Sequence, residues 1–140
     1  MKKTKRYELT FEDETDIEVY GISSAYIDYR LAWELNSFMA IQLEKLDKKL
    51  EVEDRKTKLL NSFFLYFFSD EENWTKYYLI RNKQENRYLV TSKQFVDYFL
   101  VIEDNNSYKQ DELLTLLRKI NGIVAAFPID EDLEFLEYLS

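Results

Sequence analysis

Asp97 is the side chain whose setting in this sequence is most typical of chemistry. It stands between Val96 and Tyr98 in an otherwise apolar segment, where an ionised carboxylate is strongly unfavourable unless a cation pairs with it. One interpretation is an acid that exchanges a proton with a bound ligand. The other is a structural carboxylate that meets Arg30 or Lys83, or that lies on a sheet edge and fixes the strand register.

Arg30, Trp33 and Asn36 form a second candidate site, because a spacing of three places them on one surface of a predicted helix. An arginine binds a carboxylate through two parallel N–H groups, and a tryptophan ring stacks on flat or cationic groups. Such a row suits a carboxylate or a flat ligand. The alternative is helix-to-sheet packing in which the polar ends reach water. The candidate ligand-binding residues are thus Arg30, Trp33, Asn36 and Asp97, and no residue is assigned a catalytic role.

Composition excludes several classes of site. The 140 residues include no histidine, no cysteine, 2 glycines and 1 proline. The commonest general base, the commonest zinc ligands and all disulfides are therefore missing. The acidic runs at 12–16, 70–72 and 130–132 lack the alternating ligands and central glycine of a calcium loop. We expect no cofactor and no metal, and the composition favours a protein without enzymatic activity.

The elements that position these residues follow from hydrophobic periodicity. We predict strands at 17–22, 41–46, 59–68, 74–82, 87–91, 95–102 and 123–129, with an exposed loop or strand extension at 47–58. We predict helices from Ser23 and Ser24 to Met39, after the capping-box spacing of Ser107 and Gln110, and briefly after Asp130. Asn121 and Gly122 predict a left-handed helix stop, and Pro128 confines the last strand to a sheet edge.

This order of elements predicts a single domain over residues 1–140 with an α+β fold. The sheet is antiparallel or mixed, βαβ-like units stand at both ends, and helices pack on it in a loosely ferredoxin-like arrangement. The segment Phe63–Phe68 is apolar on both alternating faces, which is typical of a strand covered on both sides. We expect one shared core that includes Phe63, Leu65, Phe67, Val96, Tyr98, Leu100, Leu117 and Ile120.

The first helix carries two apolar stripes. One stripe consists of Ile27, Leu31, Leu35, Phe38 and Met39, and the other of Tyr26, Tyr29, Trp33 and Asn36. A helix with two such sides is packed on both of them, or is packed on one and bound by a partner on the other.

The charge of the chain limits the partners that we expect it to bind and its expected location in the cell. The chain has a net charge of −8, and residues 1–6 hold four of its cations in what we predict to be a disordered basic tail. From residue 7 onward 15 cations face 27 anions, so the body repels nucleic acid. The longest uncharged run, Leu59–Ser69, is only 11 residues, well short of the roughly 20 that span a bilayer. We expect a cytoplasmic protein that binds neither nucleic acid nor membranes.

The segment from Val90 to Tyr98 runs Val-Thr-Ser-Lys-Gln-Phe-Val-Asp-Tyr. Its last three residues, Val96, Asp97 and Tyr98, resemble the end of the motif that names the IPExxxVDY family of small bacterial proteins, whereas Val90, Thr91 and Ser92 stand where that motif has Ile, Pro and Glu. Residues 28–36, 82–83 and 126–130 are similar to other landmarks of the family, in the same order along the chain. The resemblance implies no assigned activity.

These observations favour a non-enzymatic protein-interaction or scaffolding module that acts as a homo-oligomer or binds another protein. The reason is an aromatic content of 16%, which is high for a chain that must bury its rings in one small core. The alternative is a small-ligand-binding or acid-base enzyme domain that uses Asp97 and Arg30.

Overall fold

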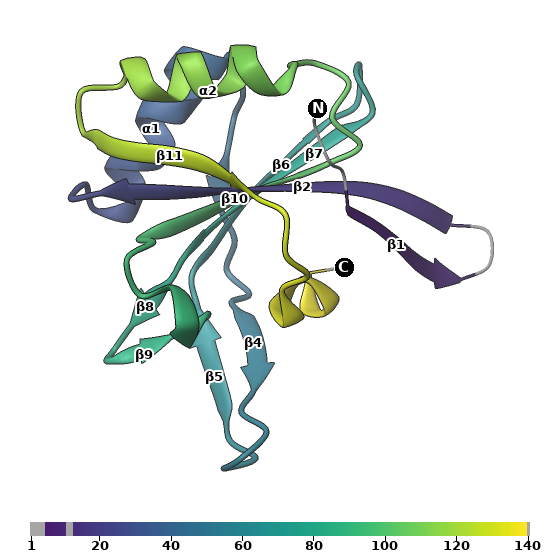
Figure 1. The fold of residues 1–140 in the computed structure, drawn as a ribbon, viewed down its shortest axis with the longest axis vertical. Coiled ribbons are helices and arrows are strands. Elements are labelled where there is room, and N and C mark those ends of the chain that lie inside the picture. The colour runs from purple at the N-terminus through teal and green to yellow at the C-terminus, as the bar shows by residue number, and fades with distance from the viewer. Residues whose placement is uncertain (1–4, 11–12, 140) are drawn as a thin grey trace.

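The computed structural model describes residues 5–10 and 13–139 (Figure 1), and its main element is an antiparallel sheet. The strands lie in the order β1 (Lys5–Thr10), β2 (Asp13–Ser24), β10 (Tyr98–Glu103), β7 (Thr75–Arg81), β6 (Leu65–Asp70) and β3 (Glu44–Lys45). A further strand, β11 (Ile123–Ile129), pairs with β2 beside β1. All strand pairs that the described residues form are antiparallel.

Two helices cover one face of this sheet (Figure 1). Helix α1 (Asp28–Met39) follows β2, and helix α2 (Gln110–Lys119) connects β10 to β11. Because β10 and β11 are both antiparallel to β2, they run parallel to each other on its two sides. The order β11, β2, β10, β7 with two helices on one face is the split βαβ arrangement of ferredoxin-like folds. The predicted α+β fold is confirmed.

The segment between α1 and β7 is an insertion into that arrangement. Its strands β3 and β6 extend the sheet, and β4 (Leu50–Glu53) pairs with β5 (Leu60–Phe63) in a separate hairpin. A second small hairpin, β8 (Lys83–Gln84) with β9 (Arg87–Tyr88), follows β7. Figure 1 shows both hairpins at the end of the molecule opposite the helices.

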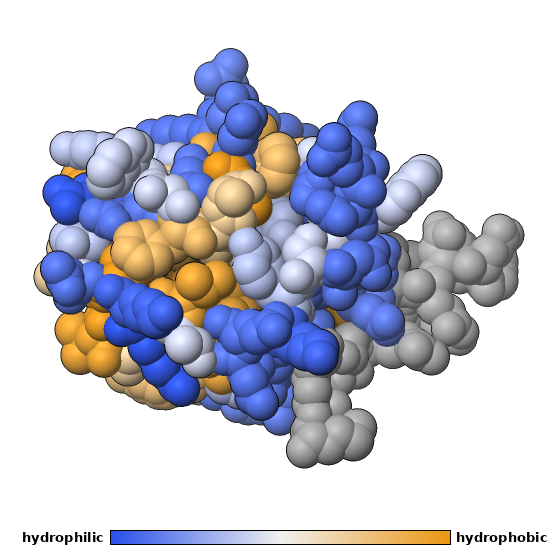
Figure 2. Space-filling view, turned by 90° about the horizontal axis from the view of Figure 1, so that it is seen from above, coloured by the Kyte–Doolittle hydropathy of each residue, from blue (hydrophilic) through white to orange (hydrophobic). Residues whose placement is uncertain are grey.

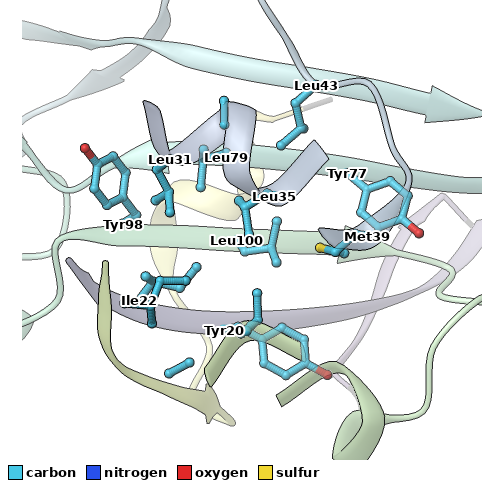
Figure 3. Close-up of a cluster of buried hydrophobic side chains, with 14 of the residues drawn as sticks. Tyr20, Ile22, Leu31, Leu35, Met39, Leu43, Tyr77, Leu79, Tyr98 and Leu100 are labelled. Carbon is cyan, nitrogen blue, oxygen red and sulfur yellow. The ribbon is translucent and has the colours of Figure 1, made fainter. Parts of the chain in front are cut away.

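The helix-covered face of the sheet forms one core (Figure 3). Leu31, Leu35 and Met39 of α1 point down onto Ile22 and Leu100 of the central strands. All five side chains are fully or almost fully buried. The 3.6-residue period of α1 and the 2-residue period of the strands place these apolar residues on facing surfaces.

The opposite face of the sheet forms a second core, which the chain covers by itself. Its covering elements are the β4–β5 hairpin, the residues after η1 (Thr91–Lys93) and the C-terminal turn η2 (Glu134–Tyr138). Phe99 of β10, for example, packs against Phe135 of η2 with 5.3 Å between ring centroids. Both faces of the central strands are therefore buried without a second chain.

The predicted core residues are correct as buried or half-buried positions, but they belong to two clusters rather than one. The second core holds Phe63, Leu65, Phe67 and Val96, and the helix-side core holds Tyr98, Leu100, Leu117 and Ile120. The physical reason is that successive residues of a strand point to opposite faces of the sheet.

Several element boundaries differ from the prediction. Helix α1 begins at Asp28 because Ser24 ends β2, and its hydroxyl accepts the N–H of Tyr26 at 3.1 Å instead of capping a helix. The segment 59–68 is two strands, β5 and β6, separated at Phe64. Of the predicted apolar stripe on α1, Ile27 and Phe38 are exposed.

The residues that begin and end α2 differ from the predicted ones. Helix α2 begins after Lys109, whose N–H donates to Glu112 Oε1 at 3.3 Å, so the predicted capping box of Ser107 and Gln110 is wrong. Gly122 has no left-handed φ, and the helix ends on the extended residue Ile120. Pro128 does lie on an edge strand, since within the described part of the chain β11 pairs with β2 and with no other strand.

The N-terminal prediction is tested only in part. Lys5 and Arg6 belong to strand β1 rather than to a disordered tail, and residues 1–4 lie outside the described residues. None of the helices in the described part of the chain is long and apolar enough to cross a membrane. The same residues contain no group of three or more carboxylates placed to hold a metal ion.

Candidate functional site

Helix α1 presents two large aromatic side chains to solvent. Leu31 and Leu35 face the sheet, so Tyr29 and Trp33, which stand four residues apart, lie on the outer side of the same helix. Their exposed fractions are 66% and 63%. Residues four apart on a helix are surface neighbours, and these two rings form the centre of an exposed aromatic strip.

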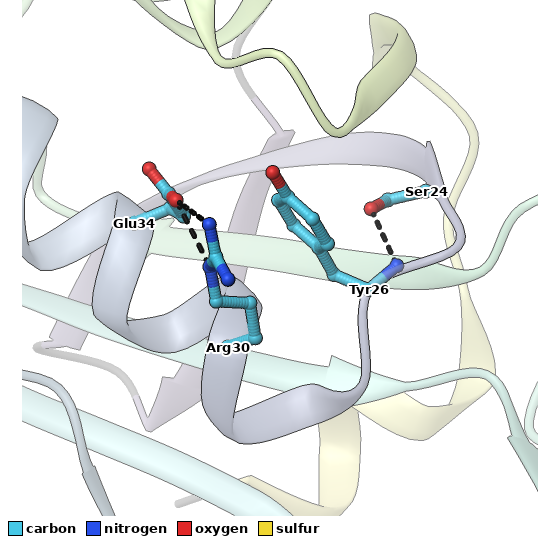
Figure 4. A network of polar contacts seen from close by, with 4 residues as sticks. All are labelled: Ser24, Tyr26, Arg30 and Glu34. Carbon is cyan, nitrogen blue, oxygen red and sulfur yellow. Dashed lines mark hydrogen bonds and ion pairs between the residues drawn. The ribbon is translucent and has the colours of Figure 1, made fainter.

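Arg30 fixes the polar part of this strip (Figure 4). Its guanidinium carbon lies 4.8 Å from the ring centre of Tyr26 and 5.7 Å from that of Trp33. Its Nε donates to Glu34 Oε2 at 3.0 Å, and its Nη2 lies 2.9 Å from the same oxygen (Figure 4). The hydrogen bond to Glu34 is the main cause that raises the pKa of Arg30. A planar cation stacked between aromatic rings is thus held in one orientation.

Tyr26 anchors this strip to the core. Its N–H donates to Ser24 Oγ, and its carbonyl oxygen accepts the hydroxyl of the buried Tyr98 at 2.5 Å. Its ring lies against Gly122, in the turn between α2 and β11. The surface that Arg30 and Trp33 share therefore rests on a residue with three separate attachments to the fold.

Asn36 does not belong to that surface. Its Oδ1 accepts the N–H of Leu43 at 2.8 Å, and its Nδ2 donates to the carbonyl oxygen of Leu43 at 3.2 Å. The side-chain amide thereby bonds to both backbone groups of Leu43, as a neighbouring strand would, and fixes the position of the chain after α1. Of the predicted row, the structure brings together Arg30 and Trp33 and assigns Asn36 to a structural contact.

Asp97 is exposed and lies just before β10, so the expectation of a carboxylate inside an apolar strand is wrong. Its Oδ2 accepts the N–H of Ser24 at 2.8 Å, and its own N–H donates to the carbonyl oxygen of Ile22 at 2.9 Å. Asp97 therefore ties the end of β2 to β10, which is the register-fixing role. Arg30 pairs with Glu34 instead, and these separate partners lend no support to an acid-base site that uses Arg30 and Asp97 together.

The helix-covered face of the molecule gathers apolar side chains in one region. Figure 2, which views this face from above, shows them on the left half, over α1 and the end of α2, with hydrophilic residues around them. Ile27 before α1, Phe38 of α1 and Val124 of β11 are exposed large apolar residues. The helix-covered face therefore exposes apolar side chains in addition to the aromatic strip of α1.

Two open pockets of about 400 Å³ each flank strand β5, far along the sequence from the predicted site. Neither is lined by Arg30, Trp33, Asn36 or Asp97. Neither pocket was predicted from the sequence, although adjacent leucines at 59 and 60 directly after a highly charged run were an available signal.

Comparison with known proteins adds no assignment to this geometry. The chain matches no protein-family model, and no curated protein matches it.

Proposed function

We propose that this protein is a non-enzymatic interaction module that self-associates through the outer face of α1, defined as Tyr29, Arg30, Trp33 and Ser37. The observation that carries the proposal is the pair of exposed aromatic rings on a well-anchored helix. Tryptophan, tyrosine and arginine are the residues most enriched among those that dominate binding energy at interfaces. Contiguous apolar surface on a folded domain is typical of a protein contact.

The structure changes the reason for expecting a dimer. The two apolar faces of residues 63–68 and the second apolar stripe of the first helix both favoured a dimer, but the β4–β5 hairpin and η2 already cover the second face of the sheet. The surplus aromatic surface that still supports the proposal lies on α1. Relatedness to the IPExxxVDY family remains part of the proposal and rests on the order of the matching segments alone.

The outer face of α1 is suited to pairing with its own copy. In an antiparallel pair of α1 helices related by a twofold axis at Trp33, Tyr29 of one copy lies beside Ser37 of the other. A large side chain then meets a small one. Arg30 lies on this face and its ion-pair partner Glu34 lies beside it, so each copy presents one cation and one anion, and two antiparallel copies bring opposite charges together.

Sedimentation of two tryptophan variants tests this function. At about 50 µM we expect the wild-type chain to sediment at twice its 17.0 kDa mass, a concentration at which a biological dimer persists. Trp33→Ala should weaken the dimer at least about tenfold. Trp74→Ala is the matched control, because Trp74 is 81% exposed but lies in the turn before β7.

The same measurements also define what would contradict the proposal. A wild-type chain that sediments as a clean 17.0 kDa species at that concentration excludes self-association through any face. Equal loss of the dimer in Trp33→Ala and Trp74→Ala excludes α1 as the interface. Thermal unfolding of both variants confirms that they are folded.

A further inference from the structure

A groove between the two small hairpins carries the features of a second binding site. Its lining consists of Lys49, Leu59, Leu60, Asn61, Ser62, Gln84, Glu85 and Arg87, and it encloses about 400 Å³. Strand β5 forms one wall and the β8–β9 hairpin forms the other. Figure 1 shows these hairpins at the opposite end of the molecule from α1, so the groove is separate from the proposed dimer face.

This end of the molecule has a charge opposite to the rest. Residues 44–60 and 81–93 contain 10 cations and 6 anions, whereas the other residues from 7 onward contain 5 cations and 21 anions. Lys49 and Arg87 bring two of those cations to the groove, against the single carboxylate of Glu85. An anionic ligand is therefore attracted here and repelled elsewhere on the body.

One polar group of the groove is fixed by a hydrogen bond, and another has no hydrogen-bond partner among the described residues. Arg87 Nη1 donates to Asn61 Oδ1, which fixes the guanidinium at the groove wall. Gln84 Oε1 is buried and finds no hydrogen-bond partner among the described residues. A buried acceptor without a donor is unfavourable, so a ligand that supplies an N–H at this point gains affinity from it.

The rim of the groove is apolar and its far wall is a tight hairpin. Leu59 and Leu60 are 56% and 61% exposed, although large apolar side chains are ordinarily covered. Glu85 and Asn86 hold φ values of 51° and 66°, the left-handed pair that closes a two-residue hairpin. This turn joins β8 and β9, which form that wall of the groove.

The chain itself shows what kind of segment binds to this basic end. On the other side of β5, the acidic C-terminal segment places Glu134 Oε2 3.0 Å from Arg55 Nη2. Glu131 likewise pairs with Lys93 at 2.5 Å. Leu133, which lies between these two carboxylates, and Phe135, which follows the second one, enter the second core. A segment that alternates carboxylates with bulky apolar side chains thus docks beside β5 already.

We propose that the groove binds an extended acidic peptide of the same alternating type from another protein. A carboxylate of the peptide pairs with Arg87 and Lys49, an apolar side chain packs on Leu59 and Leu60, and a backbone N–H donates to Gln84 Oε1. The carboxylate belongs to an aspartate or glutamate side chain or to a free C-terminus, since both have the same chemistry.

Fluorescence polarisation with a dye-labelled peptide tests this site on the full chain. The probe is Asp-Leu-Glu-Leu-Glu-Gly with a blocked C-terminus, and its counterpart Asn-Leu-Gln-Leu-Gln-Gly removes the charges only. We expect the acidic probe to bind at least about tenfold more tightly, with an affinity that falls as salt rises. A second acidic probe with a free C-terminus shows, by tighter binding, that the terminal carboxylate is the preferred group.

Charge-reversal variants locate the binding. Arg87→Glu should weaken binding of the acidic probe at least about tenfold. Two other charge reversals should leave binding of the acidic probe unchanged. These are Lys76→Glu, at an exposed residue of β7, and Arg55→Glu, on the other side of β5. The proposal is overturned if Lys76→Glu weakens binding of the probe as much as Arg87→Glu does. It is also overturned if Arg55→Glu weakens binding and Arg87→Glu does not, or if the wild-type chain does not bind the probe. Trp33→Ala should bind the probe normally, so this test is independent of the dimer.

Discussion

The ring of Tyr26 fills the space that a side chain at position 122 would need. A Cβ placed on Gly122 would stand 2.0 Å from Cζ of Tyr26 and 2.1 Å from Cε2. The glycine has no left-handed φ, so it is required here for the close approach and not for its backbone freedom. The turn after α2 and the loop before α1 are thereby fitted to each other.

Gly122→Ala should therefore destabilise the protein by about 1–3 kcal/mol, because the added methyl group overpacks a filled space. The displaced Tyr26 ring also supports Arg30, so the variant should weaken self-association. The free energy of unfolding in urea measures the first effect and sedimentation the second. In a Tyr26→Ala background the same glycine change should cost little, and equal costs in both backgrounds would contradict the contact.

Asn82 is a buried polar residue whose side-chain amide makes three hydrogen bonds. Its Nδ2 donates to the carbonyl oxygens of Lys93 and Val96 at 3.0 and 2.8 Å, and its Oδ1 accepts the N–H of Val90 at 2.9 Å. The residue has no exposed surface. It holds the segment between β9 and β10 in place, and this segment carries Val96 into the second core.

Asn82→Asp should lower the free energy of unfolding by at least about 3 kcal/mol. The carboxylate keeps the bond from Val90 but offers no donor to two buried carbonyl oxygens and adds a buried charge. Denaturation in urea measures the loss. Asn121→Asp is the control, because Asn121 is exposed and should change stability by less than about 0.5 kcal/mol. Similar losses in the two variants would argue against the role of Asn82.

Buried tyrosines make the fold sensitive to alkali. Burial raises the pKa of Tyr98 to about 12, and it raises the pKa values of Tyr20, Tyr66 and Tyr78 still further. The Tyr20 hydroxyl also donates a hydrogen bond to Glu18 at 2.7 Å, and the Tyr78 hydroxyl donates one to Glu103 at 3.2 Å. All four phenols are therefore held protonated in the folded chain.

The stability these tyrosines contribute is complete below the unfolded pKa of about 10 and is lost as pH rises above it. In that range the unfolded chain ionises and the folded chain does not. Each buried tyrosine should then lower the free energy of unfolding by about 1.4 kcal/mol per pH unit. Tyrosinate absorbance should rise together with loss of circular dichroism. Full ionisation of all 11 tyrosines near pH 10 in a folded chain would contradict this.

Local patterns predicted the parts of the fold that depend on near neighbours. The strand 123–129 matches β11 at both ends, and the inward residues Leu31, Leu35 and Met39 of α1 follow from helical spacing. The covering of the second sheet face was missed, because η2 reaches it from more than 30 residues away in sequence from β10. No local period records such a contact.

The same distinction applies to the candidate site. The contact of Arg30 with Trp33 follows from a spacing of three on one helix. The sequence left two interpretations of Asp97 open, because the partner that decides between them is the backbone N–H of Ser24, 73 residues away. It left two for Asn36 as well, because a side chain that pairs with backbone groups looks, in sequence, like one that binds a ligand.

A variant at Phe135 tests whether the second core is covered within a single chain or by a second copy. It is almost fully buried in η2 and packs on Phe99 in the second core, so Phe135→Ala should lower the free energy of unfolding by about 3–5 kcal/mol. Phe95→Ala is the control, since the exposed Phe95 only stacks on Phe127 and should lose less than about 1 kcal/mol. If η2 covers this face within one chain, the loss measured by urea denaturation is the same at low and high protein concentration. A loss that grows on dilution would mean that a second copy covers the face, and that the η2 packing is not what keeps it buried in solution.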